Sequence, residues 1–299
     1  MAKRMAIRAL TPAVIVLSFL ATPARGVDVV TCSQSIPSRE TGVLQSDLDC
    51  TAAEIGVYLE GGASVSLNGH TITGAHRDVP GSVGIACPAS CTVAGPGQVM
   101  GFDAGVFAAN ALQVRDLDVH DCVDGVRASH LLAVNVTANN NSEAGFGAEF
   151  MRGFGVTANG NGEYGFYGPH LIATDMTANG NGEAGLAVFE SMRATNVTVS
   201  GSGTYGVATG RLVGTGLVIT GNADVGIYAT SLKLRDSDVS GNNGYALGID
   251  LQVDRAPRLR RTRCGKSLQS PSAEAPFPTS WGICTDDSAA ARLSQNPWS

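Results

Sequence analysis

The sequence is poor in aromatic, charged and metal-binding side chains. Aromatic residues make up 6% of its 299 positions and Asp, Glu, Lys and Arg together 15%, while His occurs 5 times and Met 6 times. The absence of His, Met and Cys clusters argues against a soft-metal centre. The scarcity of aromatic residues, together with 38 Gly, favours tight turns and strands over helices.

Long apolar runs are also absent beyond the N-terminal segment, so no later stretch qualifies as a membrane span. Residues 1–26 have the composition of a secretory signal peptide: a basic start with Lys3 and Arg4, a short apolar stretch over 10–21, and small residues before Val27. The alternative is an uncleaved anchor. Cleavage predicts a secreted/extracellular or periplasmic protein with no membrane association afterwards.

Basic residues become scarcer still in the mature chain. Cleavage removes four of the 20 Lys and Arg residues and none of the 26 Asp and Glu residues, which leaves a net charge of −10. This charge disfavours nucleic acid and anionic membranes as partners. It also disfavours direct binding of polyanionic sugars, so neutral glycans and acidic glycans bridged by a metal cation stay open.

The seven cysteines fit an exported protein. Their positions favour three disulfides, although spacing alone does not fix connectivity. The favoured pairs are Cys32–Cys50, Cys87–Cys91 and Cys264–Cys284. Cys122 is left over, and we expect a small buried apolar side chain there rather than a reactive thiol.

The most informative feature is an internal repeat of 20 or 21 residues. A glycine followed by an apolar residue recurs at Gly84, Gly105, Gly125, Gly145, Gly165, Gly185, Gly206 and Gly226. Self-similarity at this period indicates a solenoid. Twenty residues are too few for a strand–helix unit of the βαβ kind, and the signature of leucine-rich repeats is absent. Each repeat is therefore predicted to form one coil of short strands.

The aligned repeats show the period-2 pattern of strands with one buried face. A first strand directs Phe146 and Phe166 inward, and a second directs Val156 and Ala158 inward with Thr157 between them outward. A corner follows, where two columns are rich in Asn: one contains Asn139, Asn159 and Asn179, and the other Asn141, Asn161, Asn181, Asn222 and Asn242. Stacked amides at these positions are predicted to bond from coil to coil as an asparagine ladder.

These repeats, with the segment SVSLNGHTITG over residues 64–74, resemble the coils of the pectin lyase-like superfamily. The resemblance implies an all-β fold, a single-stranded right-handed parallel β-helix with about 20 residues per coil and disulfide-stapled terminal caps. The expected organisation is a β-helix over 27–251, with an N-terminal cap over 27–62 and coils over 63–251. An irregular C-terminal cap or tail is expected over 252–299.

Proteins of this superfamily include polysaccharide lyases, hydrolases, uronate epimerases and adhesins, and the fold does not choose among them. The densest group of polar side chains is RDLDVHDCVDG, residues 115–125. We predict Asp118, His120 and Asp121 as catalytic residues, because a His beside carboxylates can act as a general acid or base. The phrase Asp-Val-His-Asp resembles the D-P-H-D phrase of mannuronan epimerases, with Val in place of Pro. The alternative is a polar corner that ends the asparagine ladder.

The same stretch predicts a metal site. Carboxylate oxygens suit calcium, and the predicted ligands are Asp116, Asp118 and Asp121. Predicted substrate-binding residues lie on outward faces, where aromatic rings can stack on sugars; they are Asp116, Arg127, Tyr167, His170 and Asp175. His130 and His170 share a column but lie two coils apart, about 10 Å at the usual strand spacing, so they cannot share one metal ion.

These observations favour a protein whose partner is extracellular polysaccharide or a cell-surface glycan. The enzyme hypothesis is a uronate-processing lyase or epimerase-like activity, with calcium as its one candidate cofactor. The H-G and R-I-K phrases of polygalacturonase-like hydrolases are absent. One alternative is a non-catalytic structural or adhesive surface protein. Another is a periplasmic metal-handling β-helix, similar to the copper-binding maturation proteins. The sequence does not define an oligomeric state.

Overall fold

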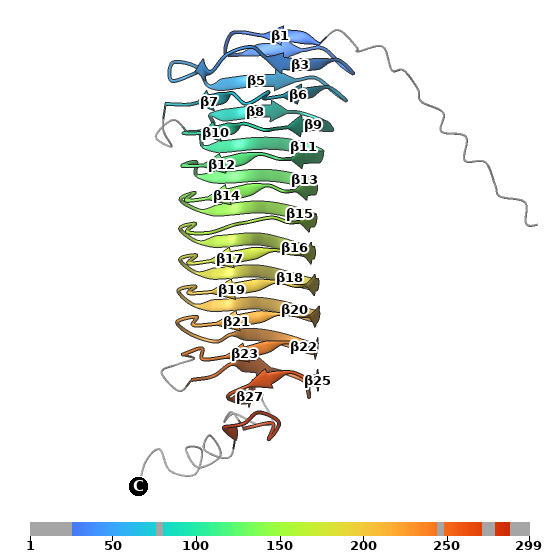
Figure 1. The fold of residues 1–299 in the computed structure, drawn as a ribbon, viewed down its shortest axis with the longest axis vertical. Coiled ribbons are helices and arrows are strands. Elements are labelled where there is room, and N and C mark those ends of the chain that lie inside the picture. Colours follow the sequence, from blue (N-terminus) through green and yellow to red (C-terminus); the bar gives the residue numbers. More distant parts are fainter. Residues whose placement is uncertain (1–25, 76–79, 244–247, 271–278, 288–299) are drawn as a thin grey trace, which may run out of the picture.

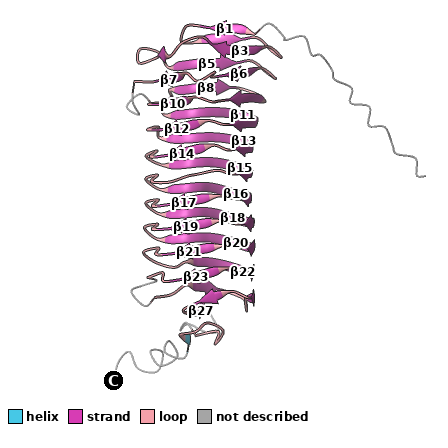
Figure 2. Ribbon diagram, in the orientation of Figure 1, coloured by secondary structure: helices cyan, strands magenta, loops and turns pink. Residues whose placement is uncertain are grey.

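The computed structural model describes residues 26–75, 80–243, 248–270 and 279–287. In these residues, parallel strands stack along one axis into a β-solenoid (Figure 1), and Figure 2 shows strands in every coil. The predicted parallel β-helix with coils of about 20 residues is thereby confirmed. No helix in the described part of the chain is long and apolar enough to cross a membrane. The predicted signal peptide lies almost wholly outside the described residues.

Each central coil contains one long strand and then a short one, except one coil in which Thr157 forms isolated bridges to Thr137 and Thr177 in place of a short strand. The long strands are β11 (Ala104–Arg115), β13 (Asp124–Val134), β15 (Ala144–Phe154), β16 (Tyr164–Thr174), β18 (Ala184–Thr195), β20 (Tyr205–Thr215) and β22 (Ile227–Arg235). The short strands are β12 (Asp118–His120), β14 (Thr137–Asn139), β17 (Thr177–Asn179), β19 (Thr198–Ser200), β21 (Val218–Thr220) and β23 (Asp238–Ser240). Equivalent positions of successive coils face one another, as Phe146 does Phe166.

The long strands turn a corner near their middle. In β13, Val126 and Ala128 are buried, and then Leu131 and Ala133 of the opposite parity are buried. Since side chains of a strand alternate between faces, this change of parity marks a bend. The first and second halves of each long strand therefore form two sides of the solenoid. Where a long strand has one extra residue, it lies at this corner. For example, two residues separate Val188 from Ser191, whereas one separates the paired Thr209 from Arg211.

The coils near both ends have the same parallel pairing with shorter strands. The N-terminal strands are β1 (Val27–Val29), β2 (Gln34–Ile36), β3 (Thr41–Leu44), β4 (Leu48–Asp49), β5 (Ile55–Leu59), β6 (Ser64–Ser66), β7 (Thr71–Thr73), β8 (Val83–Cys87), β9 (Cys91–Ala94) and β10 (Gln98–Met100). The C-terminal strands are β24 (Leu251–Val253), β25 (Arg258–Arg260), β26 (Arg263–Cys264) and β27 (Ser267–Gln269). Because β1 pairs with β3 and β24 with β27, coil stacking extends into both segments expected to be caps.

The three favoured disulfides are present, at Cys32–Cys50, Cys87–Cys91 and Cys264–Cys284. The first and third lie near the two ends of the solenoid. The second joins β8 to β9, which pair with the first and second halves of β11 and so flank the same corner. Cys122 belongs to none of these disulfides and is fully buried, as expected of a small apolar side chain.

The predicted asparagine ladder is also confirmed, with an inner column that is buried. The backbone N–H and the Nδ2 group of Asn141 both donate to Oδ1 of Asn161 at 3.0 Å, and Asn161 repeats this arrangement toward Asn181. At its first coil the ladder begins at Cys122, whose N–H donates to Oδ1 of Asn141 at 3.1 Å. Each amide thus satisfies backbone groups of a neighbouring coil that would otherwise be buried without partners.

The repeating glycine makes room for this ladder. A Cβ at Gly165 would lie 3.0 Å from Nδ2 of Asn181, and one at Gly145 would lie 2.9 Å from Nδ2 of Asn161. The same Cβ atoms would contact the glycine carbonyl of the next coil at 2.5 to 3.0 Å. The glycine column and the asparagine column are therefore two halves of one packing arrangement.

Ser202 interrupts the inner column, and its replacement by Asn is expected to stabilise the protein by about 1 kcal/mol. The Ser202 hydroxyl is buried and has no hydrogen-bond partner among the described residues. An amide there would accept from Asn181, as Asn222 accepts from Ser202 N at 3.0 Å. Thermal unfolding followed by circular dichroism measures the gain, with Ser202→Ala as the matched control. A lower melting temperature for Ser202→Asn than for Ser202→Ala would contradict the prediction.

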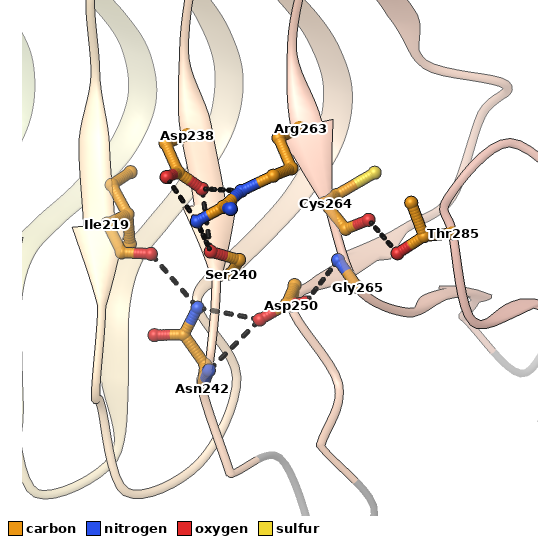
Figure 3. A network of polar contacts seen from close by, with 9 residues as sticks. All are labelled: Ile219, Asp238, Ser240, Asn242, Asp250, Arg263, Cys264, Gly265 and Thr285. Atoms are coloured by element: carbon orange, nitrogen blue, oxygen red, sulfur yellow. Dashed lines mark hydrogen bonds and ion pairs between the residues drawn. The ribbon is translucent and has the colours of Figure 1, made fainter.

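At the C-terminal end, a carboxylate terminates the ladder (Figure 3). Oδ1 of the buried Asp250 accepts from the N–H and Nδ2 of Asn242 at 3.0 and 2.9 Å. Its Oδ2 accepts from the N–H groups of Gly265 and Lys266 at 2.6 and 3.1 Å. One side chain therefore joins the last Asn of the column to the final coil.

Residues 255–263 contain five arginines, and two of them connect the final coil to the coil before it. Arg263 donates to Asp238 at 2.8 Å (Figure 3), and Arg261 forms a two-nitrogen pair with Asp236. The Arg261 guanidinium lowers the pKa of the exposed Asp236 carboxyl. These pairs give both arginines a structural role in closing the solenoid.

Candidate functional site

The predicted catalytic residues lie on and beside the short strand β12. Asp118 and His120 face outward on either side of the buried Val119. Asp121 follows at the corner with a φ of 54°, where its carboxylate oxygen lies 2.8 Å from Nδ1 of His120. His120 stands in register with Asn139, so it takes the outer Asn position of this corner. His120 and Asp121 are therefore in contact. They also occupy the corner position where the alternative hypothesis expects polar residues that end the asparagine ladder.

The predicted calcium ligands are not brought together. Asp116 lies at a different corner, with a φ of 54°, where it accepts from Nδ2 of Asn135 at 3.1 Å. Asp121 lies beyond the other end of β12. Within the described ranges, no group of three or more His, Cys, Asp and Glu side chains is placed to hold a metal ion. Neighbours in the sequence are separated here because a short strand places its two ends at two corners.

The predicted substrate-binding residues also fall into separate places. Arg127 and Tyr167 share one column on the first halves of the long strands, with Gly147 between them. His170 lies on the second halves, 3.2 Å from Glu190. Asp175 occupies a corner with a φ of 53° and accepts from Nδ2 of Asn196 at 3.0 Å.

Arg127 and Tyr167 line an open groove of about 630 Å³ on the first halves of β11 to β18. Its floor consists of small residues, among them Ala128, Gly147 and Ala148. Gly147, which has no side chain, lies between Arg127 and Tyr167 in this column. The side chains around this floor are Phe107, Asp124, Arg127, Glu143, Glu149, Glu163, Tyr164, Tyr167 and Phe189.

Aromatic rings cover one end of the groove and are exposed to solvent. Tyr167 and Phe189 are 45% and 52% exposed, and their ring centroids lie 4.8 Å apart in an edge-to-face arrangement. The ring centroid of Tyr164 lies 5.0 Å from that of Tyr167. Exposed rings held in fixed orientations by one another provide apolar faces with a polar hydroxyl edge.

Carboxyl groups line the edge where the long strands begin. Glu143, Glu163 and Glu183 stack in three successive coils, since the N–H of each later residue donates to the carbonyl of the previous one. Partial removal from water raises the pKa of Glu163, and the charges of Glu143 and Glu183 add to this rise. The hydroxyl of Tyr164 donates to Glu183, which is the main reason that its pKa rises to about 12.

Asp124 lies in the preceding coil, one residue beyond Val123, the position that stacks on Glu143, and it is buried. Burial raises the pKa of its carboxyl, and Arg127 opposes the rise through an ion pair of 3.0 Å. The groove therefore combines two carboxyl groups of raised pKa, one guanidinium and a cluster of rings. Neither Asp124 nor the stacked glutamates were in the predicted site. Their signal is the Glu that recurs every 20 residues in the phrases SEAG, GEYG and GEAG.

No protein-family model matches the chain, and no curated protein sequence matches it. Among solved structures, similarity extends to the enzymatically active domain of bacteriophage CBA120 tailspike protein 2, with 13% identity and a TM-score of 0.42. That alignment covers 80% of this chain and 43% of the tailspike chain. Pectate lyase Pel9A aligns with 12% identity and a TM-score of 0.36, over 78% of this chain and 72% of that enzyme. Similarity at this level carries no information about activity or ligand.

Proposed function

We propose that the protein binds an extended extracellular glycan in the groove of β11 to β18. The observation that carries this proposal is the cluster of Tyr164, Tyr167 and Phe189 beside hydrogen-bonding carboxyl groups. Sugar rings present apolar faces that stack on aromatic rings, and hydroxyl groups that donate to carboxylates. The three disulfides support a location outside the cytoplasm.

The charge of the groove favours a neutral glycan. Asp124, Glu143, Glu149 and Glu163 line it together with the single cation Arg127. Partly desolvated carboxylates repel an acidic sugar more strongly than they would in water. A neutral chain avoids this repulsion and still pairs its hydroxyl groups with the carboxylates.

Replacing Tyr167 by alanine is expected to weaken glycan binding about fivefold to tenfold, the equivalent of one aromatic contact of about 1 kcal/mol. The measurement is isothermal titration with cellohexaose, laminarihexaose and mannohexaose. Tyr228→Ala is the matched control, because Tyr228 occupies the same column three coils away and outside the groove. If Tyr167→Ala bound these glycans as tightly as the unaltered protein, the groove would not be the glycan-binding site.

The same samples test for catalysis by product analysis, including the absorbance of unsaturated uronate from acidic substrates. A carboxyl of raised pKa stays protonated at higher pH than usual, as a general acid requires. Hydrolysis lost in Asp124→Asn would place that role in the groove. The 2.8 Å pair of His120 and Asp121 favours the uronate-processing hypothesis instead. Turnover of an acidic glycan lost in His120→Ala would support it.

A further inference from the structure

The second halves of the long strands carry a line of exposed cations. Arg152 pairs with Ile172, Ile172 with Arg193, Arg193 with Val213, Val213 with Lys233, and Lys233 with Arg258. In the coil of Val213, the outward residue two positions earlier is Arg211. We refer to this set as the basic column; its members are Arg152, Arg193, Arg211, Lys233 and Arg258.

These cations have no acidic partner among the described residues, a property that they share with Arg39, Arg255 and Arg260 but not with five other arginines. Arg115, Arg127, Arg235, Arg261 and Arg263 each form an ion pair with an aspartate. None of the basic column forms an ion pair with any residue of the described part. Arg152 instead lies over the ring of Phe150, 5.7 Å from its centroid. The protein has a net charge of −6, so these unpaired cations give one side of it a local positive charge.

The spacing of the basic column has a definite repeat. Coils stack about 4.8 Å apart, so Arg152, Arg193 and Lys233 recur about every 10 Å along the solenoid axis. Ile172 and Val213 place apolar side chains between them. A shallow hollow of about 260 Å³ lies on this side, lined by Phe150, His170, Ile172, Arg193 and Arg211 among others.

We propose that the basic column binds an extended acidic glycan that lies along the solenoid axis, with anionic groups on alternate sugars. Guanidinium groups pair with carboxylate or sulfate through two parallel hydrogen bonds. Charges on alternate sugars match the cations of alternate coils, and the intervening sugar faces meet Ile172 and Val213. This surface shares no residue with the groove, so the inference stands apart from the proposed function.

The repeat favours a glycan over nucleic acid. Nucleic acid carries its phosphates at a much closer spacing than the cations of the column. Most of those phosphates would be left without a partner on a protein of net charge −6. A sparsely charged chain leaves few anionic groups unpaired and uses the apolar positions as well.

The test measures binding of hyaluronan decasaccharide, which carries one carboxylate per disaccharide, by isothermal titration at low salt. The test variant replaces Arg152, Arg193, Arg211 and Lys233 by Gln. Each exposed pair accounts for roughly a twofold to fivefold change, so the variant is expected to bind on the order of 100-fold more weakly. Arg115→Gln is the matched control, because Arg115 is exposed on the same sheet but paired with Asp116; its affinity should be unchanged.

A second measurement does not depend on the variant. Raising the salt concentration should weaken hyaluronan binding by the unaltered protein and leave binding of cellohexaose in the groove unchanged. Equal hyaluronan affinity in the quadruple variant and the unaltered protein would overturn the proposal. So would tighter binding of a single-stranded DNA 20-mer than of hyaluronan at the same salt concentration. Failure of the groove would appear in Tyr167→Ala alone, which separates the two proposals.

Discussion

Replacing Asp250 by alanine is expected to lower the free energy of unfolding by about 3–5 kcal/mol. Asp250 is 1% exposed and accepts four hydrogen bonds, two from Asn242 and one each from the backbone of Gly265 and Lys266. Alanine leaves these donors without an acceptor, and at Asn242 they are buried. Denaturant unfolding monitored by circular dichroism measures the loss.

Two control variants define the cause of this loss. Asp250→Asn keeps one acceptor oxygen and directs an NH₂ group at the remaining donors, so its loss should be smaller than that of alanine. Asp254→Ala removes an exposed carboxylate in the same region and should change stability by no more than about 0.5 kcal/mol. If Asp250→Ala were as stable as Asp254→Ala, the ladder would not need its terminal carboxylate.

Replacing Gly165 by alanine is expected to cost about 2–3 kcal/mol, although alanine normally favours a strand over glycine. The added Cβ would lie 2.5 Å from the carbonyl oxygen of Gly185 and 3.0 Å from both Ala178 and the amide of Asn181. Relief of these contacts requires the coils to separate or the ladder amide to move. The melting temperature and the denaturant midpoint both report this cost.

Gly147→Ala is the matched substitution, because Gly147 lies in the neighbouring long strand and its added Cβ would contact only Cγ of Arg127, at an ordinary 3.5 Å. We expect it to be neutral or to stabilise by about 0.5–1 kcal/mol. A loss of similar size at both glycines would mean that the strands do not tolerate any side chain there. The explanation by ladder packing would then be wrong.

Much of the fold could be predicted from the sequence because each coil repeats the same physical problem. The inward positions Phe146 and Phe166, the amides of Asn161 and Asn181, and the small residue at Gly165 must all recur when coils stack in register. A period of 20 residues therefore contains the strands, the corners and the ladder together. The corner formed by one residue with positive φ was harder to predict, because that residue is Gly155, Asp175 and Asn196 in successive coils.

The candidate site was less predictable, for a related reason. The stretch around His120 is dense in polar residues along the chain, but alternation and corners distribute those side chains over different sides. Glu143 and Glu163 are 20 residues apart and stack directly. In a solenoid, side chains that lie together come from one column of the repeat alignment. Residues that are adjacent in the sequence point to different sides of the solenoid.

The coil length has a consequence for how the chain finds its structure. Pairings such as Phe146 with Phe166 join residues 20 apart, and no strand of the central coils needs a distant partner. A separation of 20 in 299 residues is a relative contact order of roughly 0.07, a value typical of helical bundles. Each coil closes a loop of the same modest entropy, so growth of the stack resembles addition of turns to a helix. An all-β protein built this way can acquire native structure progressively, from whichever end becomes available first.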